Sequence, residues 1–157
     1  MRPTRTGPVA LAAVAVALLG WGALRWWTAT GHVPPALPWS APLVLVLLAV
    51  AVGAFGWPVR RWTQGRRDRP LDPLRAARTV VLAKAAQYGG ALFTGWYLAQ
   101  GLALLPTTDV EPRRALLLRA AVSLVAAAAV WLTGWLVERW CRVEPPSDDD
   151  PAGAAPA

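Results

Sequence analysis

Charged residues in this chain are confined to short segments that separate long apolar runs. Four such runs cover about residues 8–27, 40–57, 76–105 and 115–137, while 55% of the chain is apolar and 16% charged. A helix of twenty residues, rising 1.5 Å per residue, is about 30 Å long and matches the hydrocarbon core of a bilayer. The pattern predicts an all-α integral membrane protein, a four-transmembrane-helix bundle within residues 1–142.

The first run, residues 8–27, follows Arg2 and Arg5, and a secretory signal peptide has a similar beginning. No clear A-x-A cleavage site follows it, and the segment 25–27 (RWW) is typical of an anchor at the membrane interface. We therefore expect the first span to be retained.

The third run carries the most local information. It is preceded by Asp72, which can cap a helix N-terminus, and by Pro73, which suits the first helical position. It also contains the only lysine, Lys84, six residues after Arg78 and so about 9 Å further along the helix axis. A charge within a span suggests a functional site. At this depth, however, the long side chain could simply extend back to the interface, and we favour that interpretation.

Small and polar side chains occupy two neighbouring faces of the third run, and bulkier apolar ones predominate on the rest. Small residues let helix backbones approach closely, and glycine otherwise disfavours a helix. We therefore expect the third run to be the hub of the bundle, with Gly90 and Gly95 at helix contacts. The alternative is that the small residues only reflect an alanine-rich composition. The candidate polar and packing stripe is Lys84, Gln87, Tyr88, Gly90, Thr94 and Gly95.

The distribution of arginine predicts the orientation in the membrane. Most arginines lie before the first run, in the segment 58–78 or after the fourth run, whereas Arg113 and Arg114 lie in the opposite loop. Because basic residues favour the cytoplasmic side, we expect a multi-pass plasma-membrane protein with both termini and the loop 58–75 in the cytoplasm. The acidic, proline-rich tail 143–157 is predicted to be disordered.

The arginine-rich loop admits two interpretations. The first is a topology signal, which we favour, and the second is specific binding of anionic lipid headgroups or an acidic partner. Nucleic acid is not expected as a partner, because each basic cluster adjoins an apolar run. The candidate contact residues are Arg60, Arg61, Arg66, Arg67, Arg69, Arg75 and Arg78.

The chain shows no set of residues suited to catalysis. The only histidine, His32, and the only cysteine, Cys141, lie at opposite ends of the predicted bundle, and no acidic residue lies deep in a span. We therefore expect no enzyme activity, no metal and no cofactor. Glu138, at the cytoplasmic end of the fourth run, could form an ion pair with Lys84, Arg75 or Arg78, or could be solvated.

Several motifs along the chain together resemble one family. These are MRPTR at the start, PP-x-L-P-W at 34–39, LDPLRAAR…AKA at 71–85, GAL-x-x-GWY at 90–97, and LVERWCRVEPP at 136–146. With LLP at 104–106, they resemble domain-of-unknown-function family 3180, an actinobacterial membrane-protein family. The resemblance implies a small multi-span plasma-membrane protein whose gene tends to neighbour folate-biosynthesis genes, and it implies no activity.

Two functions from different classes remain open. The first is a non-enzymatic accessory or scaffold protein that works through helix packing and the basic cytoplasmic loop, with a membrane-protein partner or as a homo-oligomer. The second is a small channel or transporter subunit, in which the polar stripe of the third run lines a path between protomers.

Overall fold

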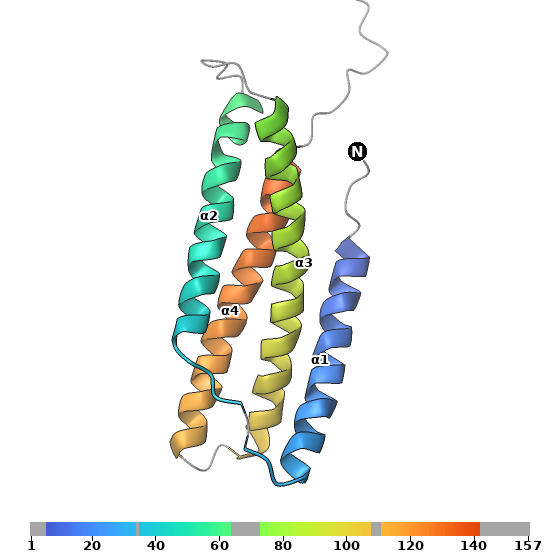
Figure 1. Ribbon diagram of the computed structural model, residues 1–157, viewed down its shortest axis with the longest axis vertical. Coiled ribbons are helices and arrows are strands. Elements are labelled where there is room, and N and C mark those ends of the chain that lie inside the picture. Colours follow the sequence, from blue (N-terminus) through green and yellow to red (C-terminus); the bar gives the residue numbers. More distant parts are fainter. Residues whose placement is uncertain (1–5, 34, 64–72, 108–110, 142–157) are drawn as a thin grey trace, which may run out of the picture.

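The chain forms four long helices in the computed structural model, which describes residues 6–33, 35–63, 73–107 and 111–141, apart from the side chains of 6, 62–63, 73–76 and 107. The prediction of an all-α protein is confirmed. The helices are α1 (Thr6–Ala29), α2 (Ser40–Thr63), α3 (Pro73–Leu104) and α4 (Glu111–Trp140), and a short 3-10 helix, η1 (Leu105–Thr107), follows α3 (Figure 1).

Three of these helices, α1, α2 and α4, are long and apolar enough to cross a membrane. The longest helix, α3, does not reach the same apolar content. It begins at Pro73, as predicted, whereas the predicted Asp72 cap lies outside the described residues. Another difference from the expected spans is that α2 continues through Pro58 as far as Thr63. Beyond that proline, the buried side chain of Val59 still packs the helix against the bundle.

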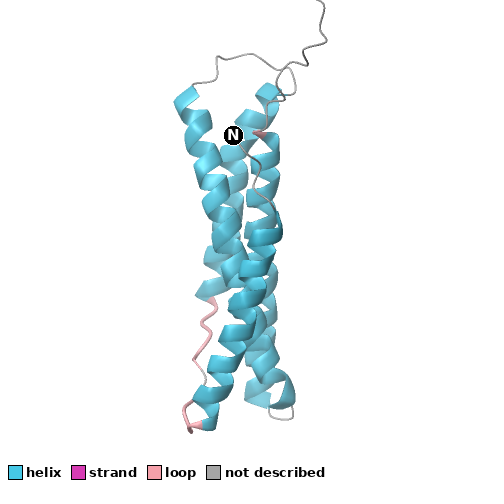
Figure 2. Cartoon of the chain, turned by 90° about the vertical axis from the view of Figure 1, so that its right-hand side faces the viewer, coloured by secondary structure: helices cyan, strands magenta, loops and turns pink. Residues whose placement is uncertain are grey.

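The helices form an elongated bundle in which α1 and α3 run in one direction and α2 and α4 in the other (Figures 1 and 2). α3 packs most extensively against α4 and also against α1, and it contacts α2 to a smaller extent, while α2 packs mainly against α4. The expected hub role of the third run is thus confirmed. Its contacts with three helices agree with its composition, because small residues let neighbouring helix backbones approach closely.

Two clusters of small buried side chains make up the core. The larger one joins α2, α3 and α4 and includes Val52, Ala83, Ala127 and Val137. The smaller one joins α1 to α3 through Val9, Ala13 and Ala91, and Trp131 of α4 packs against it. Because the core residues are mostly alanine and valine, the helix axes can lie close together.

Large apolar side chains cover the outside of the bundle. Leu11, Leu19 and Val125 are each at least 70% exposed, and many other leucines and valines of α1, α2 and α4 are exposed to a smaller extent. A continuous apolar surface of this kind would be an aggregation liability in water, but it suits contact with lipid tails. The fold therefore has the surface expected of a membrane-associated protein.

The two ends of the bundle differ in their side chains. The end at which α1 and α3 begin and α2 and α4 finish is called here the Glu138 end. The opposite end, where α1 and α3 finish and α2 and α4 begin, contains a pocket and is called the pocket end.

Candidate functional site

Two glycines of the predicted stripe lie where α3 meets its neighbours. A Cβ atom at Gly90 would lie 2.8 Å from Cα of Trp131 on α4 and even closer to its backbone nitrogen. A Cβ at Gly95 would overlap the carbonyl oxygen of Ala13 on α1, 3.1 Å from Cβ of Val16. Backbone atoms cannot rotate away as a side-chain tip can, so both contacts require glycine.

A repeated Gly-Trp dipeptide, which the sequence reasoning missed, marks one such contact in every helix. Gly95 belongs to one of these dipeptides, and the glycine of each of the other three also faces another helix. Gly20 of α1 meets Ala99 of α3, Gly56 of α2 meets Val137 of α4, and Gly134 of α4 meets Ala83 and Gln87 of α3. The pattern G-W-x-V-x-R-W occurs twice, at residues 56–62 and 134–140, in α2 and α4, which pack in parallel. Self-comparison of the sequence at an offset of 78 residues would have found this signal.

The polar members of the stripe are not brought together on one surface. Gln87 is fully buried against Gly134 of α4, whereas the next residue, Tyr88, is 44% exposed. The hydroxyl of Thr94 donates a hydrogen bond of 2.7 Å to the carbonyl oxygen of Gly90 within α3, and Lys84 is half-buried. Consecutive helical residues point about 100° apart, which separates Gln87 from Tyr88.

Buried polar atoms occur in both α3 and α4. The side-chain amide of Gln87 and the hydroxyl of Ser123 have no hydrogen-bond partner among the described residues, and both residues are 0% exposed. An unpaired buried polar group costs about 1–3 kcal/mol. Packing of the helices therefore encloses polar side chains as well as apolar ones.

At the Glu138 end, the guanidinium of Arg60 lies over two indole rings. It is 5.3 Å from the ring centre of Trp57 and 4.8 Å from that of Trp140, so it links α2 to α4. Arg61 and Arg78 are exposed at the same end. Of the other predicted contact residues, Arg66, Arg67 and Arg69 lie outside the described residues, as does the side chain of Arg75.

We expect Arg60→Ala to lower the free energy of unfolding by about 1 kcal/mol, since each cation–π contact contributes about 0.5–1 kcal/mol at an accessible site. Arg61→Ala removes an exposed arginine from the next position and should change stability by less than about 0.5 kcal/mol. Unfolding of both variants in detergent, followed by circular dichroism, checks this expectation. Equal losses for the two variants would contradict a link between α2 and α4 through Arg60.

Glu138, in the last turn of α4, is buried, with 7% of its surface exposed. Its ion pairing with Lys84, Arg75 or Arg78 stays a prediction. Just beyond the helix, burial and the Glu138 carboxylate raise the pKa of the Cys141 thiol. A raised pKa leaves little thiolate at neutral pH, so Cys141 is a poor nucleophile.

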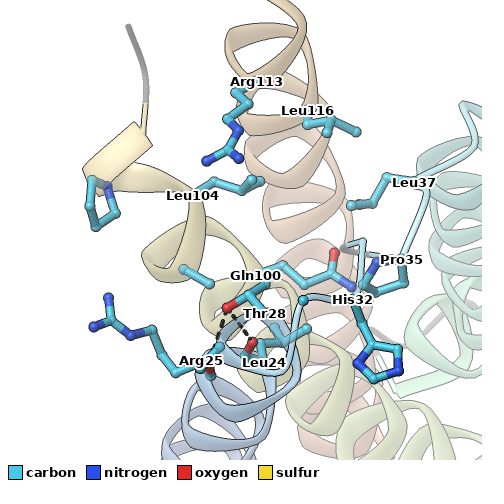
Figure 3. Close-up of a pocket in the computed structure, with 14 residues that line it drawn as sticks. Leu24, Arg25, Thr28, His32, Pro35, Leu37, Gln100, Leu104, Arg113 and Leu116 are labelled. Carbon is cyan, nitrogen blue, oxygen red and sulfur yellow. Dashed lines mark hydrogen bonds between the residues drawn. The ribbon is translucent and has the colours of Figure 1, made fainter. Parts of the chain in front are cut away.

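The pocket end contains a cavity of about 420 Å³ that the sequence did not predict. Figure 3 shows that its walls come from the end of α1, the connection to α2, the end of α3 and the start of α4. Gln100 and Arg113 line it, and no short motif links them, since only the fold brings the ends of α1 and α3 beside the start of α4. Within the described residues, no three His, Cys, Asp or Glu side chains are grouped so as to hold a metal ion.

Comparison with known proteins identifies the family but no function. No curated protein and no solved structure matches the chain. The model of one family, described as a protein of unknown function (DUF3180), matches residues 9–145 and so includes all four helices except a few residues at the start of α1. The chain belongs to the DUF3180 family of proteins of unknown function.

Proposed function

We propose that the protein is a non-enzymatic accessory or scaffold protein of the plasma membrane. In this proposal all four helices cross the bilayer, α3 included, with both termini and the Glu138 end in the cytoplasm. The central position of α3 supports its placement in the bilayer. The orientation is supported by the concentration of arginine at the start of the chain, between residues 60 and 78, and at residues 139 and 142.

The observation that carries this proposal is the close packing of α3. Gly90 and Gly95 place its backbone against α4 and α1, and Gly134 brings the backbone of α4 against Gln87 in return. Such contacts fix the helices relative to one another and hold the ends of the bundle in a set geometry. A rigid transmembrane unit with a basic cytoplasmic face is suited to positioning a partner rather than to performing chemistry.

The basic face at the Glu138 end supplies the contact surface. Arg61 and Arg78 come from different helices and are exposed there. Their charge favours anionic headgroups or an acidic protein surface, and each arginine near an anionic membrane surface contributes about 1 kcal/mol. The partner that we propose for this basic face is an acidic membrane protein, whereas a homo-oligomer of this chain would form through helix packing.

The test is purification of the tagged full-length protein from its native membrane in mild detergent. We expect a stoichiometric partner or a defined homo-oligomer with the wild type, and at least a fivefold lower yield of the complex with an acidic partner for the double variant Arg61→Gln/Arg78→Gln. Arg114→Gln, at the pocket end, is the matched control and should keep the complex. A monomer without any stoichiometric partner would contradict the scaffold proposal.

A second candidate, a channel or transporter subunit, draws support from the buried amide of Gln87, which has no hydrogen-bond partner in the described part of the chain. Here Lys84, Gln87, Tyr88 and Thr94 would line a polar path between protomers. The dispersal of these side chains around α3 makes this candidate the weaker one. Its test is solute flux in proteoliposomes, which Lys84→Met should abolish, and unchanged flux in that variant would refute it.

A further inference from the structure

The pocket combines an apolar wall with a few polar groups. Leucine, alanine and proline side chains from α1, the α1–α2 connection, α3, η1 and α4 form most of its lining. A volume of about 420 Å³ lies within the range of small-molecule sites, about 300–1,000 Å³. The pocket can therefore hold a ligand that is partly apolar.

A buried acceptor without a partner faces this pocket. Gln100 is 7% exposed, and its Oε1 has no hydrogen-bond partner among the described residues. Figure 3 shows its side chain extending from α3 toward the α1–α2 connection. Thr28, also in the lining, donates its hydroxyl hydrogen to the carbonyl oxygens of Leu24 and Arg25, at 2.9 and 3.1 Å, so its own oxygen is left to accept. The pocket thus offers acceptors to a ligand that carries hydroxyl groups.

The charged side chains of the lining are both arginines. Arg113 extends from α4 toward Leu104 on the opposite wall (Figure 3), and Arg25 lines the pocket from α1, with its guanidinium also over the Trp21 ring. None of the lining residues that the structure describes is acidic. Guanidinium groups bind phosphate through charge-assisted hydrogen bonds, which are stronger than neutral ones.

The position of the pocket agrees with a ligand that comes from the membrane. Trp26, Trp27 and Trp39 are exposed at this end of the bundle, and tryptophan collects at the headgroup level of a bilayer. The pocket lies at the same end, where α1 finishes and α4 begins. Both of these helices are apolar enough to cross a membrane. A headgroup in the pocket would leave its acyl chains beside the apolar outside of the bundle.

We propose that this pocket binds the headgroup of an anionic, hydroxyl-bearing phospholipid of the phosphoglycerol type. The phosphate contacts Arg113, with Arg25 adding positive charge, and a headgroup hydroxyl donates to Oε1 of Gln100. The proposal depends on the transmembrane placement in the proposed function but not on the scaffold role, so a missing protein partner would leave it intact.

The experiment measures lipid binding to delipidated full-length protein by native mass spectrometry. The probes are phosphatidylglycerol and phosphatidylmethanol, which share the phosphodiester charge but differ in the headgroup hydroxyls. We expect the wild type to prefer phosphatidylglycerol roughly fivefold to tenfold, as one added hydrogen bond predicts. Gln100→Met should remove that preference, while Arg113→Gln should weaken the binding of both lipids roughly tenfold or more. Arg114→Gln, which alters a neighbouring exposed arginine outside the pocket, should change neither the preference for phosphatidylglycerol nor the binding of the two lipids.

Two controls keep the outcomes distinct. Gln100→Met removes the buried Oε1, which has no partner among the described residues. Its unfolding temperature in detergent should therefore not fall below that of the wild type, which separates lost binding from lost folding. Glycerol 3-phosphate tests a soluble source of the same chemistry. Equal binding of the two lipids by the wild type, a preference retained by Gln100→Met, or full competition by glycerol 3-phosphate at the lipid's own concentration would each overturn the assignment.

Discussion

Gly90→Ala is expected to destabilise the bundle by about 1–3 kcal/mol, the usual cost of forcing extra volume into a packed contact. The added Cβ would lie 2.8 Å from Cα of Trp131 and closer still to its backbone nitrogen. To make room, α3 and α4 would have to separate, and that separation would weaken the neighbouring contacts of Gln87 with Gly134. Gly90→Leu should destabilise the bundle more than Gly90→Ala, because a larger side chain needs a larger separation of α3 from α4.

The preceding residue supplies a closely matched control. A Cβ at Gly89 would enter open space, since it would meet no other atom within 4 Å. Gly89→Ala should therefore leave stability unchanged or raise it by up to about 1 kcal/mol, because alanine is the better helix former. Reversible unfolding in mixed micelles, followed by circular dichroism, compares the two variants. Equal stability of Gly90→Ala and Gly89→Ala would refute the close approach of α3 to α4.

Gly95→Leu is expected to detach α1 from α3 while α2, α3 and α4 stay packed. A Cβ at Gly95 would overlap the carbonyl oxygen of Ala13, and each ~1.4 kcal/mol of such strain lowers the ratio of docked to detached α1 tenfold. Disulfide trapping measures this docking. A Cβ at Gly20 would lie 3.1 Å from Cβ of Ala99, slightly closer than the roughly 3.5–4.5 Å of a disulfide, so Gly20→Cys with Ala99→Cys should crosslink after a small adjustment.

Cys141→Ser provides the background for this trapping, because Cys141 is the only native cysteine. In that background we expect Gly20→Cys and Ala99→Cys to crosslink, and adding Gly95→Leu should lower the crosslinking rate about tenfold. Adding Gly101→Leu should not lower the rate, because a Cβ at Gly101 would meet nothing within 4 Å. Gly22→Cys paired with Ala99→Cys should not crosslink. Undiminished crosslinking with Gly95→Leu would show that α1 does not depend on this contact.

Patterns along single helices were the part of the fold that the sequence could predict. The run lengths predicted four helices, Pro73 predicted the start of α3, and the glycines of α3 predicted close helix contacts. These features depend on local chemistry, such as capping, proline geometry and the cost of glycine in a helix. Partner helices could not be predicted in the same way, because the order α1–α3–α4–α2 depends on contacts between distant residues.

The candidate sites also divide into features that the local sequence predicts and features that depend on contacts between distant residues. The exposed Tyr88 and the buried Gln87 are neighbours in sequence, and only the place of α4 beside α3 decides which of them is buried. The pocket around Gln100 and Arg113 was missed because its walls come from separate parts of the chain. The Gly-Trp repeat was, by contrast, present in the sequence and could have predicted the packing glycines Gly20, Gly56 and Gly134.

The most direct test of the proposed transmembrane arrangement is cysteine labelling from each side of the membrane. In the Cys141→Ser background, Thr30→Cys places an exposed thiol at the pocket end and Arg61→Cys places one at the Glu138 end. We expect a membrane-impermeant maleimide to label Thr30→Cys in intact cells stripped of their wall, and Arg61→Cys only in inverted vesicles. Labelling of both positions from the same side would contradict a bundle that spans the membrane with its Glu138 end in the cytoplasm.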